Sequence, residues 1–252
     1  MKFFKSLFAC FSTYSRIPMP VINLDSDDMK YSLAFFPLIG VVIGLFQYGF
    51  YSICMHWNIP QIVFALIATC IPILVTGGIH VDGYMDTMDA FNSYGDREKK
   101  LMIMKDPHTG AFAVIYLVLY CLLYTAFIYM INAKSIILFC TSFVISRICS
   151  GLSVLTIKSA KSEGMLQSLK KNSSEKVVIT ILIIFAVISE ALIVVYSPIV
   201  GAAMGIVAVA LFILYRYKCL KELGGVTGDT SGCFLCIMEL ILLMISAIGG
   251  IL

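Results

Sequence analysis

The sequence predicts an all-α, polytopic transmembrane bundle of about seven crossings with a cytoplasmic N-terminus. Three observations predict this fold class. Of the 252 residues, 60% are hydrophobic and 13% are charged, and the mean hydropathy is +0.96, which is far from the composition of soluble domains. Several apolar stretches approach the ~20 residues that a helix needs to cross hydrocarbon. Basic residues gather in alternate connecting segments, the pattern that sets membrane orientation.

The predicted crossings use most of the chain, so we expect residues 1–252 to form one integral membrane domain. Two very short breaks, at Asn132 to Lys134 and at Ser197-Pro198, predict that the third and fourth crossings, and the fifth and sixth, form tight antiparallel hairpins. The seven stretches lie at residues 33–55, 61–79, 110–131, 135–156, 177–196, 199–215 and 231–252.

Residues 1–32 precede the first crossing. Phe4, Leu7, Phe8 and Phe11 recur there at helical spacing, which is typical of a helix lying in the membrane interface. The alternative is an N-terminal segment that is apolar without forming such a helix.

The basic residues predict the orientation of the bundle. With the N-terminus inside, the connecting segments 80–109, 157–176 and 216–230 lie on the same side as residues 1–32. Those four segments contain all of the 18 Lys and Arg residues except Lys134 and Arg147. This positive-inside bias predicts that all four segments are cytoplasmic. The small formal charge of +3 gives no indication of nucleic-acid binding.

Aspartates follow the second crossing at positions 82, 86, 89 and 96. If this segment is helical, the four carboxylates fall within an arc of roughly 80° at 100° per residue. No Lys or Arg lies between Lys30 and Arg97, so the helix supplies no cation at i±4, which argues against an ordinary salt-bridged surface face. Crowded oxygen ligands favour Mg²⁺, with Mn²⁺ as a substitute, and we take Asp82, Asp86 and Asp89 as the metal ligands.

Two further residues of this run are candidates for the site. Asn92 stands at its end as a candidate substrate ligand. His80 stands at its start, where it either positions a substrate group or acts as a base, or sits at the helix end without such a role.

Lys105, Asp106 and Gly110 immediately precede the third crossing, on the side predicted for the aspartates. Lys105 is a candidate phosphate ligand and Asp106 a candidate metal ligand or base. Gly110 would allow close backbone approach. The alternative is an anchoring lysine followed by a turn.

A glycine-rich segment from Gly224 to Gly232 joins the last two crossings. Backbone N–H groups at Gly228 and Thr230 are candidates for binding phosphate at the N-terminus of the next helix, and Asp229 is a candidate catalytic residue. The alternative is a flexible connector. Segments 80–109 and 216–230 are therefore expected to be the loops of the active site.

Three ionisable residues lie inside predicted crossings, namely Arg147, Glu190 and Glu239. Such residues normally face the bundle interior. Arg147 and Glu239 come at similar depths, so we predict that they pair. Arg147 is also a candidate substrate ligand, and Glu190 has no partner at its depth.

These motifs together resemble the cobalamin synthase family, the adenosylcobinamide-GDP ribazoletransferases. The resemblance rests on Arg16-Ile-Pro18, on Phe36 to Gly40, on the Gly-Gly-x-His-x-Asp-Gly-x-x-Asp-x-x-Asp run from Gly77, on Lys105-Asp106 with Gly110, and on Gly228-Asp229-Thr230. Family members usually have Arg near the position of Lys105 and more glycines after Asp89.

The resemblance implies a Mg²⁺-dependent transfer in the cytoplasmic (inner) membrane. In it, α-ribazole or its 5′-phosphate attacks adenosylcobinamide-GDP, GMP leaves, and adenosylcobalamin or its 5′-phosphate forms. In this scheme Lys105 or Arg16 offsets charge on the leaving phosphate, and Asp89 or Asp229 takes the hydroxyl proton. Membrane lipids are further partners, and a homo-oligomer is compatible with the sequence.

Two other functions remain as alternatives. A CDP-alcohol phosphotransferase also carries aspartates at a membrane surface, but its Asp-Gly is followed by Ala-Arg, whereas Tyr84-Met85 follows Asp82-Gly83 here. A membrane transporter would hold its ligands near the middle of the bilayer.

Overall fold

The computed structural model describes residues 2–20, 26–160 and 174–251, so lysines 161, 170 and 171 of the predicted cytoplasmic segment lie outside the described residues. These parts of the chain are helical, in agreement with the predicted fold class. The elements are α1 (Lys2–Tyr14), η1 (Ser26–Phe35), α2 (Phe36–His56), α3 (Gln61–Thr76), α4 (Ile79–Asn92), α5 (Arg97–Ile103), α6 (Ala111–Tyr129), α7 (Ile136–Thr156), α9 (Glu175–Tyr196), α10 (Pro198–Leu223) and α11 (Gly228–Gly249).

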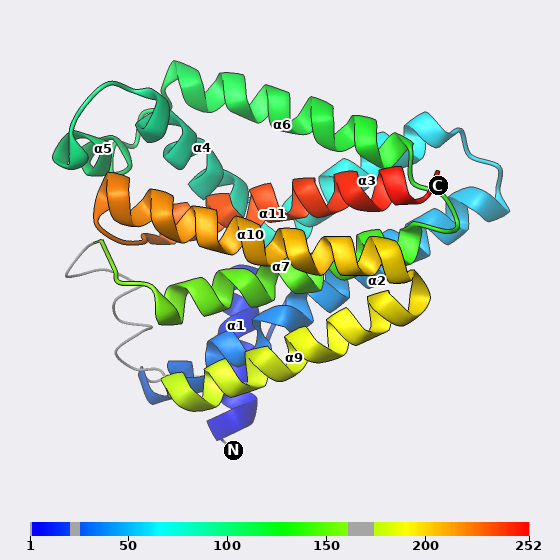
Figure 1. Cartoon of the computed structure of the whole chain (residues 1–252), viewed down its shortest axis with the longest axis horizontal. Helices are drawn as coiled ribbons and strands as arrows, with labels where there is room; N and C mark the ends of the chain where they lie inside the picture. Colours follow the sequence, from blue (N-terminus) through cyan, green and yellow to red (C-terminus); the bar gives the residue numbers. More distant parts are fainter. Residues whose placement is uncertain (1, 21–25, 161–173, 252) are drawn as a thin grey trace.

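Six helices within the described residues are long and apolar enough to span a membrane, and a bent pair formed by α3 and α4 brings the number to seven. This agrees with the predicted count of about seven. The two predicted hairpins are also present, since α6 and α7 are joined by residues 130–135, and α9 and α10 only by Ser197. The long helices α6, α7, α9 and α10 run along the long axis of the molecule, and α1 crosses them at a steep angle (Figure 1).

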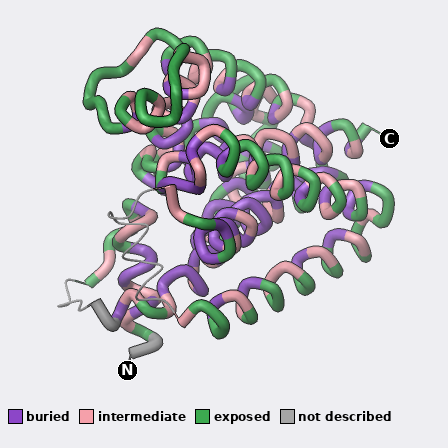
Figure 2. Tube along the Cα trace, turned by 60° about the vertical axis from the view of Figure 1, so that its left-hand side comes forward, coloured by how far each residue is buried: buried purple, intermediate pink, exposed green. Residues whose placement is uncertain are grey.

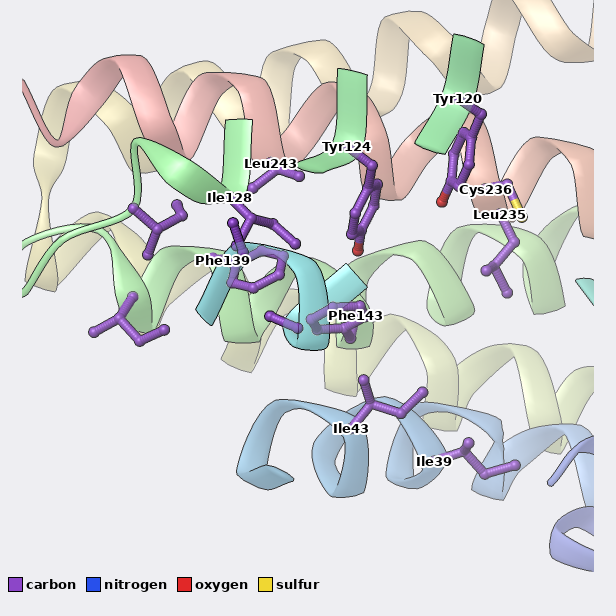
Figure 3. Packing of buried hydrophobic residues seen from close by; sticks show 14 of the residues in the cluster. Ile39, Ile43, Tyr120, Tyr124, Ile128, Phe139, Phe143, Leu235, Cys236 and Leu243 are labelled. Atoms are coloured by element: carbon purple, nitrogen blue, oxygen red, sulfur yellow. The ribbon is translucent and has the colours of Figure 1, made fainter. Parts of the chain in front are cut away.

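Helix α7 is the centre of the bundle. Most of its residues are buried, whereas fewer than a quarter are in each of α6, α9 and α10, and buried residues gather in the middle of the molecule (Figure 2). Helix α2 packs closely on α7, because a Cβ at Gly40 or Gly44 would collide with the backbone of Phe143 or Cys140. Small residues at such crossings let two membrane helices approach. Aromatic and aliphatic side chains from α2, α6, α7 and α11 fill the remaining space (Figure 3).

The second predicted crossing is broken. Two consecutive glycines, Gly77 and Gly78, have φ of +66° and +81°, a conformation that glycine adopts with little cost. They end α3 and turn the chain so that α4 leaves at 97° to it. Pro72, inside α3, cannot donate a hydrogen bond to the carbonyl of Ala68, and the side-chain amide of Gln47 donates to that oxygen instead, at 2.7 Å.

The two segments predicted as active-site loops are mostly helical, so that description is wrong for them. Segment 80–109 contains α4 and α5. Segment 216–230 begins with the end of α10 and finishes with the start of α11, which leaves only residues 224–227 between the helices. Helix α10 continues through the polar residues that were expected to follow the crossing. It ends at Gly224, which has a left-handed φ of +70°, as glycines at helix C-termini commonly do.

Candidate active site

The carboxylates predicted to share one helix face lie on α4. Asp82 is exposed, and Asp86 and Asp89 are half-buried. Their spacing of four and three residues places them on one side of the helix. The helix therefore supplies the predicted acidic face for these three residues.

Asp96 does not belong to this face, and its inclusion in the prediction is wrong. Helix α4 ends at Asn92, and Ser93 is extended. The Asp96 side chain caps α5 instead, where it accepts a hydrogen bond from the backbone N–H of Lys99 at 3.0 Å. An Asp that follows a glycine and precedes a charged helical run is a typical N-cap, and this signal was present in the sequence.

The segment before α6 reaches the acidic face through Gly110. A Cβ at this glycine would overlap both carboxylate oxygens of Asp89, so that carboxylate lies directly against the Gly110 backbone. The φ and ψ of Gly110, −80° and 166°, suit any residue. Its lack of a side chain therefore serves the close approach of Asp89 rather than a special backbone conformation.

Lys105 and Asp106 are exposed. The Asp106 carboxylate accepts hydrogen bonds from the backbone N–H of His108 at 2.9 Å and meets the His108 ring at 2.7 Å. These contacts, the backbone bond first, lower the pKa of Asp106. The bonds give Asp106 a local role in folding its own turn. The metal or base role of Asp106 and the phosphate role of Lys105 stay predictions.

The start of α11 lies beside α4. A Cβ at Gly83 would meet the backbone oxygen of Asp229 at 2.8 Å, and one at Gly232 would meet the His80 oxygen at 3.2 Å. This close crossing brings Asp229 next to the acidic helix. Gly83 and Gly232 were not predicted as site residues, and only their position, one after Asp82 and the other in the glycine-rich segment, could have indicated them.

A capping box forms the N-terminus of α11. The Thr227 hydroxyl accepts from the N–H of Thr230 at 3.1 Å, and the Thr230 hydroxyl accepts from the N–H of Thr227 at 2.9 Å. The Thr230 hydroxyl also meets the Tyr215 hydroxyl at 3.2 Å. Thr230 therefore shapes the helix start, and exposed Gly228 is the first residue of that helix. A helix N-terminus carries a partial positive charge that favours phosphate.

Arg16 lies at the N-terminal end of α4, the helix that carries the acidic face. Its backbone N–H donates to the carbonyl of Val75 at 2.8 Å, and its side chain packs over Gly77, where a Cβ would collide with the guanidinium stem. Arg16 is exposed. The structure thus brings a cation from the N-terminal segment to the bend just before α4.

The side chains of His80 and Asn92 pack against or bond to neighbouring parts of the bundle. His80 is buried, and its ring lies against Tyr14 and Phe36 at 6.4 and 5.7 Å between centroids. Helical geometry puts it on the side of α4 opposite to Asp82. The Asn92 side chain donates to the carbonyl of Met88 and accepts from the Tyr116 hydroxyl at 2.9 Å, which links α4 to α6. Their roles in binding or catalysis stay predictions.

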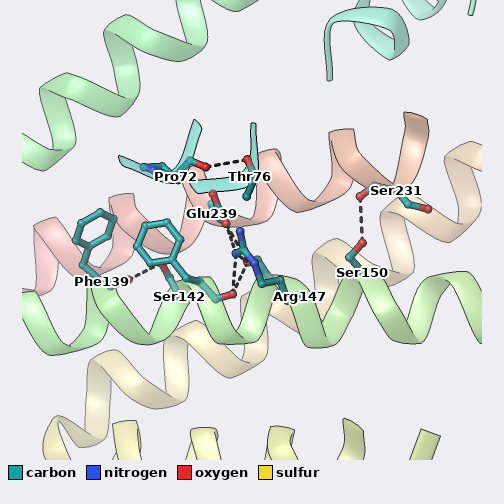
Figure 4. A network of polar contacts seen from close by, with 10 residues as sticks. Pro72, Thr76, Phe139, Ser142, Arg147, Ser150, Ser231 and Glu239 are labelled. Carbon is teal, nitrogen blue, oxygen red and sulfur yellow. Dashed lines mark hydrogen bonds and ion pairs between the residues drawn. The ribbon is translucent and has the colours of Figure 1, made fainter. Parts of the chain in front are cut away.

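Arg147 and Glu239 pair as predicted. Arg147 Nη1 lies 2.5 Å from Glu239 Oε1, between α7 and α11 (Figure 4). Arg147 is fully buried, and it lines a small cavity together with His80. This position in the bundle interior separates Arg147 from the acidic face, so its predicted contact with substrate has no support from the geometry.

The donor set of the acidic face suits a hard cation. Within the described ranges, no three His, Cys, Asp or Glu side chains converge into a complete metal site. Mg²⁺ does not need one, because it is usually held by one or two carboxylates and takes its other ligands from phosphate and water. Asp82, Asp86 and Asp89 offer only carboxylate oxygens, and the residues present therefore fit Mg²⁺ bound together with a phosphorylated substrate.

Comparison with known proteins gives a consistent result. The family model described as cobalamin-5-phosphate synthase matches residues 6–247. An adenosylcobinamide-GDP ribazoletransferase of Lachnoclostridium phytofermentans is 40% identical, covering 95% of this chain and 92% of the relative. Proteins of the same name from Clostridioides difficile and Clostridium botulinum are 34% and 31% identical, covering 91% and 94% of this chain and 92% and 95% of the relatives. No solved structure matches the chain.

Proposed function

We propose that this chain, which belongs to the cobalamin-5-phosphate synthase family, joins α-ribazole or its 5′-phosphate to adenosylcobinamide-GDP. In this reaction a ribose hydroxyl that is free in both α-ribazole and its 5′-phosphate loses its proton and forms a bond to the cobinamide-linked phosphorus. The bond from that phosphorus to the bridging oxygen breaks, and GMP leaves with the electron pair. The product is adenosylcobalamin or its 5′-phosphate.

One observation carries the proposal beyond the family name. The acidic face of α4 lies against Gly110 from the segment before α6 and beside Asp229 at the start of α11. Three segments far apart in sequence thus bring carboxylates and a helix N-terminus to one end of the bundle. A diphosphate needs both, because carboxylates recruit a divalent cation and helix N–H groups favour phosphate oxygens.

Mg²⁺ would be held by carboxylates of the set Asp82, Asp86 and Asp89. When bound, it would neutralise charge on the diphosphate and stabilise the charge that develops during transfer. Carboxylates alone would repel that substrate, so the acidic face requires the cation in order to bind it.

The chain's own residues supply the remaining functions. Arg16, packed at the bend before α4, is positioned to offset charge on the leaving GMP, and Lys105 is the second candidate for this role. With either substrate, Asp89 or Asp229 would accept the proton of the attacking hydroxyl. Asp89 is favoured because its carboxylate lies directly against the Gly110 backbone, at the segment before α6.

We place this site at the cytoplasmic side of the inner membrane. The distribution of Lys and Arg supports this orientation. Segments 1–32, 80–109, 157–176 and 216–230 hold most of these residues, and basic segments normally stay on the cytoplasmic side. The candidate spans support an integral membrane protein. A cytoplasmic site would give direct access to nucleotide substrates and release GMP into the same compartment.

The test is an assay on membranes supplied with adenosylcobinamide-GDP, α-ribazole and Mg²⁺, with GMP and the corrinoid product followed together. Asp82→Asn is expected to lower kcat by roughly 10²- to 10³-fold, as loss of one charge-stabilising group does. Asp96→Asn is the matched control, because it removes one negative charge nearby but keeps the cap of α5, and it should retain activity.

Two results would contradict the proposal. Full activity in Asp82→Asn would remove the acidic face from the reaction. Uptake of a labelled substrate into proteoliposomes without release of GMP would instead favour a transporter. Both results are read against wild-type protein inserted at the same level.

A further inference from the structure

A small cavity lies beside the bend between α3 and α4. It is lined by side chains from α3, α4, α6, α7 and α11, and the space open to the centre of a water molecule is about 10 Å³. This is close to the least that one water needs. Such a cavity holds water only where polar groups face it, and several do here, including Thr76, His80 and Arg147.

Three buried polar atoms at this cavity have no hydrogen-bond partner among the described residues. They are Nε2 of His80 and Nε and Nη2 of Arg147. His80 is 7% exposed and Arg147 0%. Buried donors and acceptors are almost always satisfied, by protein or by ordered water. One ring nitrogen and two guanidinium N–H groups at one small cavity leave positions for the hydrogen bonds of a shared water.

The ion pair holds the guanidinium in one orientation. Arg147 Nη1 donates to the carbonyl of Phe143 at 2.9 Å, to the Ser146 hydroxyl at 3.2 Å and to Glu239. Ser146 also donates to Glu239, at 3.3 Å. Glu239 and the α7 backbone thus engage one edge of the guanidinium, and Figure 4 shows the side chain directed from α7 toward Glu239 and the α3 residues Pro72 and Thr76.

We propose that one ordered water in this cavity joins Arg147 to His80, and that Arg147, Glu239 and His80 are positioning residues for the acidic helix α4. The water accepts a hydrogen bond from the Arg147 guanidinium and donates one to His80 Nε2. The chain Glu239, Arg147, water, His80 then connects α11 and α7 to the first turn of α4. This inference rests on the proposed function, because it assigns these residues to the alignment of Asp82 and Asp86.

The bend explains why the first turn of α4 needs such a connection. Gly77 and Gly78 precede it directly, both left-handed and without side chains to pack. His80 is the first buried residue after them, and Asp82 follows two positions later. Fixing His80 to the bundle therefore fixes the rotation of α4 about its axis, which decides where the carboxylates point. A misplacement of about 1 Å can cost roughly 100-fold in rate.

The main test replaces the charged pair with apolar side chains of similar size, in the double variant Arg147→Met and Glu239→Leu. Replacing a buried ion pair in this way often leaves a protein as stable as before. We expect the variant to insert and to keep its melting temperature, while kcat falls by roughly 10- to 100-fold and KM for adenosylcobinamide-GDP stays within about threefold. Glu190→Gln on α9 is the control and should leave kcat unchanged.

Amide hydrogen exchange gives a second readout that does not depend on turnover. Residues 79–86 should exchange at least about tenfold faster in the double variant, since local opening sets the exchange rate. Exchange in α7 should stay as in the wild type. Unchanged kcat, or unchanged exchange in residues 79–86, would show that the pair only stabilises the bundle, and would overturn the proposal.

His80→Phe tests the water bridge itself, because it keeps an aromatic ring between Tyr14 and Phe36 but removes the acceptor nitrogen. We expect a loss of kcat similar to that of the double variant, and no further loss when all three changes are combined. Additive losses would overturn the bridge. Should the double variant fail to accumulate in membranes, His80→Phe carries the test by kcat and exchange. Inactive wild-type protein in the same assay would instead contradict the proposed function.

Discussion

Two regions of this bundle place carboxylates in a largely apolar chain, and they treat the charge in opposite ways. Glu239 is buried and meets the guanidinium of Arg147 inside the bundle. The acidic face of α4 carries Asp82, Asp86 and Asp89 on a helix that contains no Lys or Arg. The first region is balanced by the protein's own cation, whereas the second, in the proposed function, binds a divalent cation together with the substrate.

The buried pair therefore contributes to the structure of the bundle, whereas the acidic face is the region proposed to bind the ion and the substrate. A buried pair lacking either member leaves an isolated charge in a medium of low polarity, so it is retained as a unit. Carboxylates at the exposed end of the bundle can be solvated when no ligand is bound, and they gain most when a divalent ion and a phosphate arrive together. The first three of the following experiments each change one of these two regions directly.

Removing divalent metal should have the largest effect. With EDTA present, we expect turnover to fall by on the order of 10³-fold or more, because the ion stabilises transition-state charge by several kcal/mol. Added Mg²⁺ should restore activity, and Mn²⁺ should restore part of it. The melting temperature should change little, since Arg147 and Glu239 do not depend on the ion. Full turnover in metal-free buffer would show that the acidic face does not act through a divalent ion.

Breaking the buried pair on one side should have the next largest effect, and it should act on stability. Arg147→Met alone leaves Glu239 buried without its partner, which costs about 3–5 kcal/mol of unfolding free energy. Titration with a denaturing detergent measures this loss. The apolar double variant should recover most of it, and a single variant as stable as the wild type would contradict this account of the pair.

Crowding one carboxylate of the acidic face should have an intermediate effect on activity. In Gly110→Ala the new Cβ overlaps the Asp89 carboxylate, which must move, and we expect kcat to fall roughly 10- to 100-fold. Gly49→Ala on α2 is the matched control, because a Cβ there meets nothing within 4 Å. It should retain full activity. Equal activity in both variants would show that the position of Asp89 is unimportant.

The smallest effect is expected for Asp106, whose carboxylate accepts a hydrogen bond within its own turn. Its pKa is lowered by His108, so its contribution to stability is complete above about pH 4 and is lost only as the pH falls below that value. The pH profile of activity between 6 and 8 should therefore be the same in Asp106→Asn as in the wild type, with kcat changed by no more than about twofold. A larger loss would assign Asp106 to the acidic site.

Composition and hydropathy were sufficient to predict the number and order of the crossings, because a helix in lipid must be long and apolar. They could not predict how far α10 extends, because polar residues beyond the hydrocarbon region can either continue a helix or form a loop. The break after α3 was likewise missed. It depends on the left-handed conformation of both Gly77 and Gly78, and the sequence shows only that two glycines are present.

For the site, helical spacing correctly placed three aspartates on one face, and similar depths within their crossings correctly predicted that Arg147 and Glu239 would pair. The same spacing wrongly added Asp96, because it assumed one continuous helix where Ser93 is extended and a second helix begins. The closeness of Gly110 to Asp89, and of Gly83 to Asp229, depends on how separate helices cross. Such contacts between distant segments are set by tertiary packing and leave no periodic signal in the sequence.

The right-angled bend at Gly77 and Gly78 limits how this enzyme can be engineered. Replacing glycine with alanine is a standard route to a more heat-resistant protein, but it works only where the backbone suits an L-residue. At these two positions φ is positive, so the same change would strain the junction between α3 and α4, the helix that carries the acidic face. Stabilising libraries should therefore include Gly49 and leave Gly77 and Gly78 untouched.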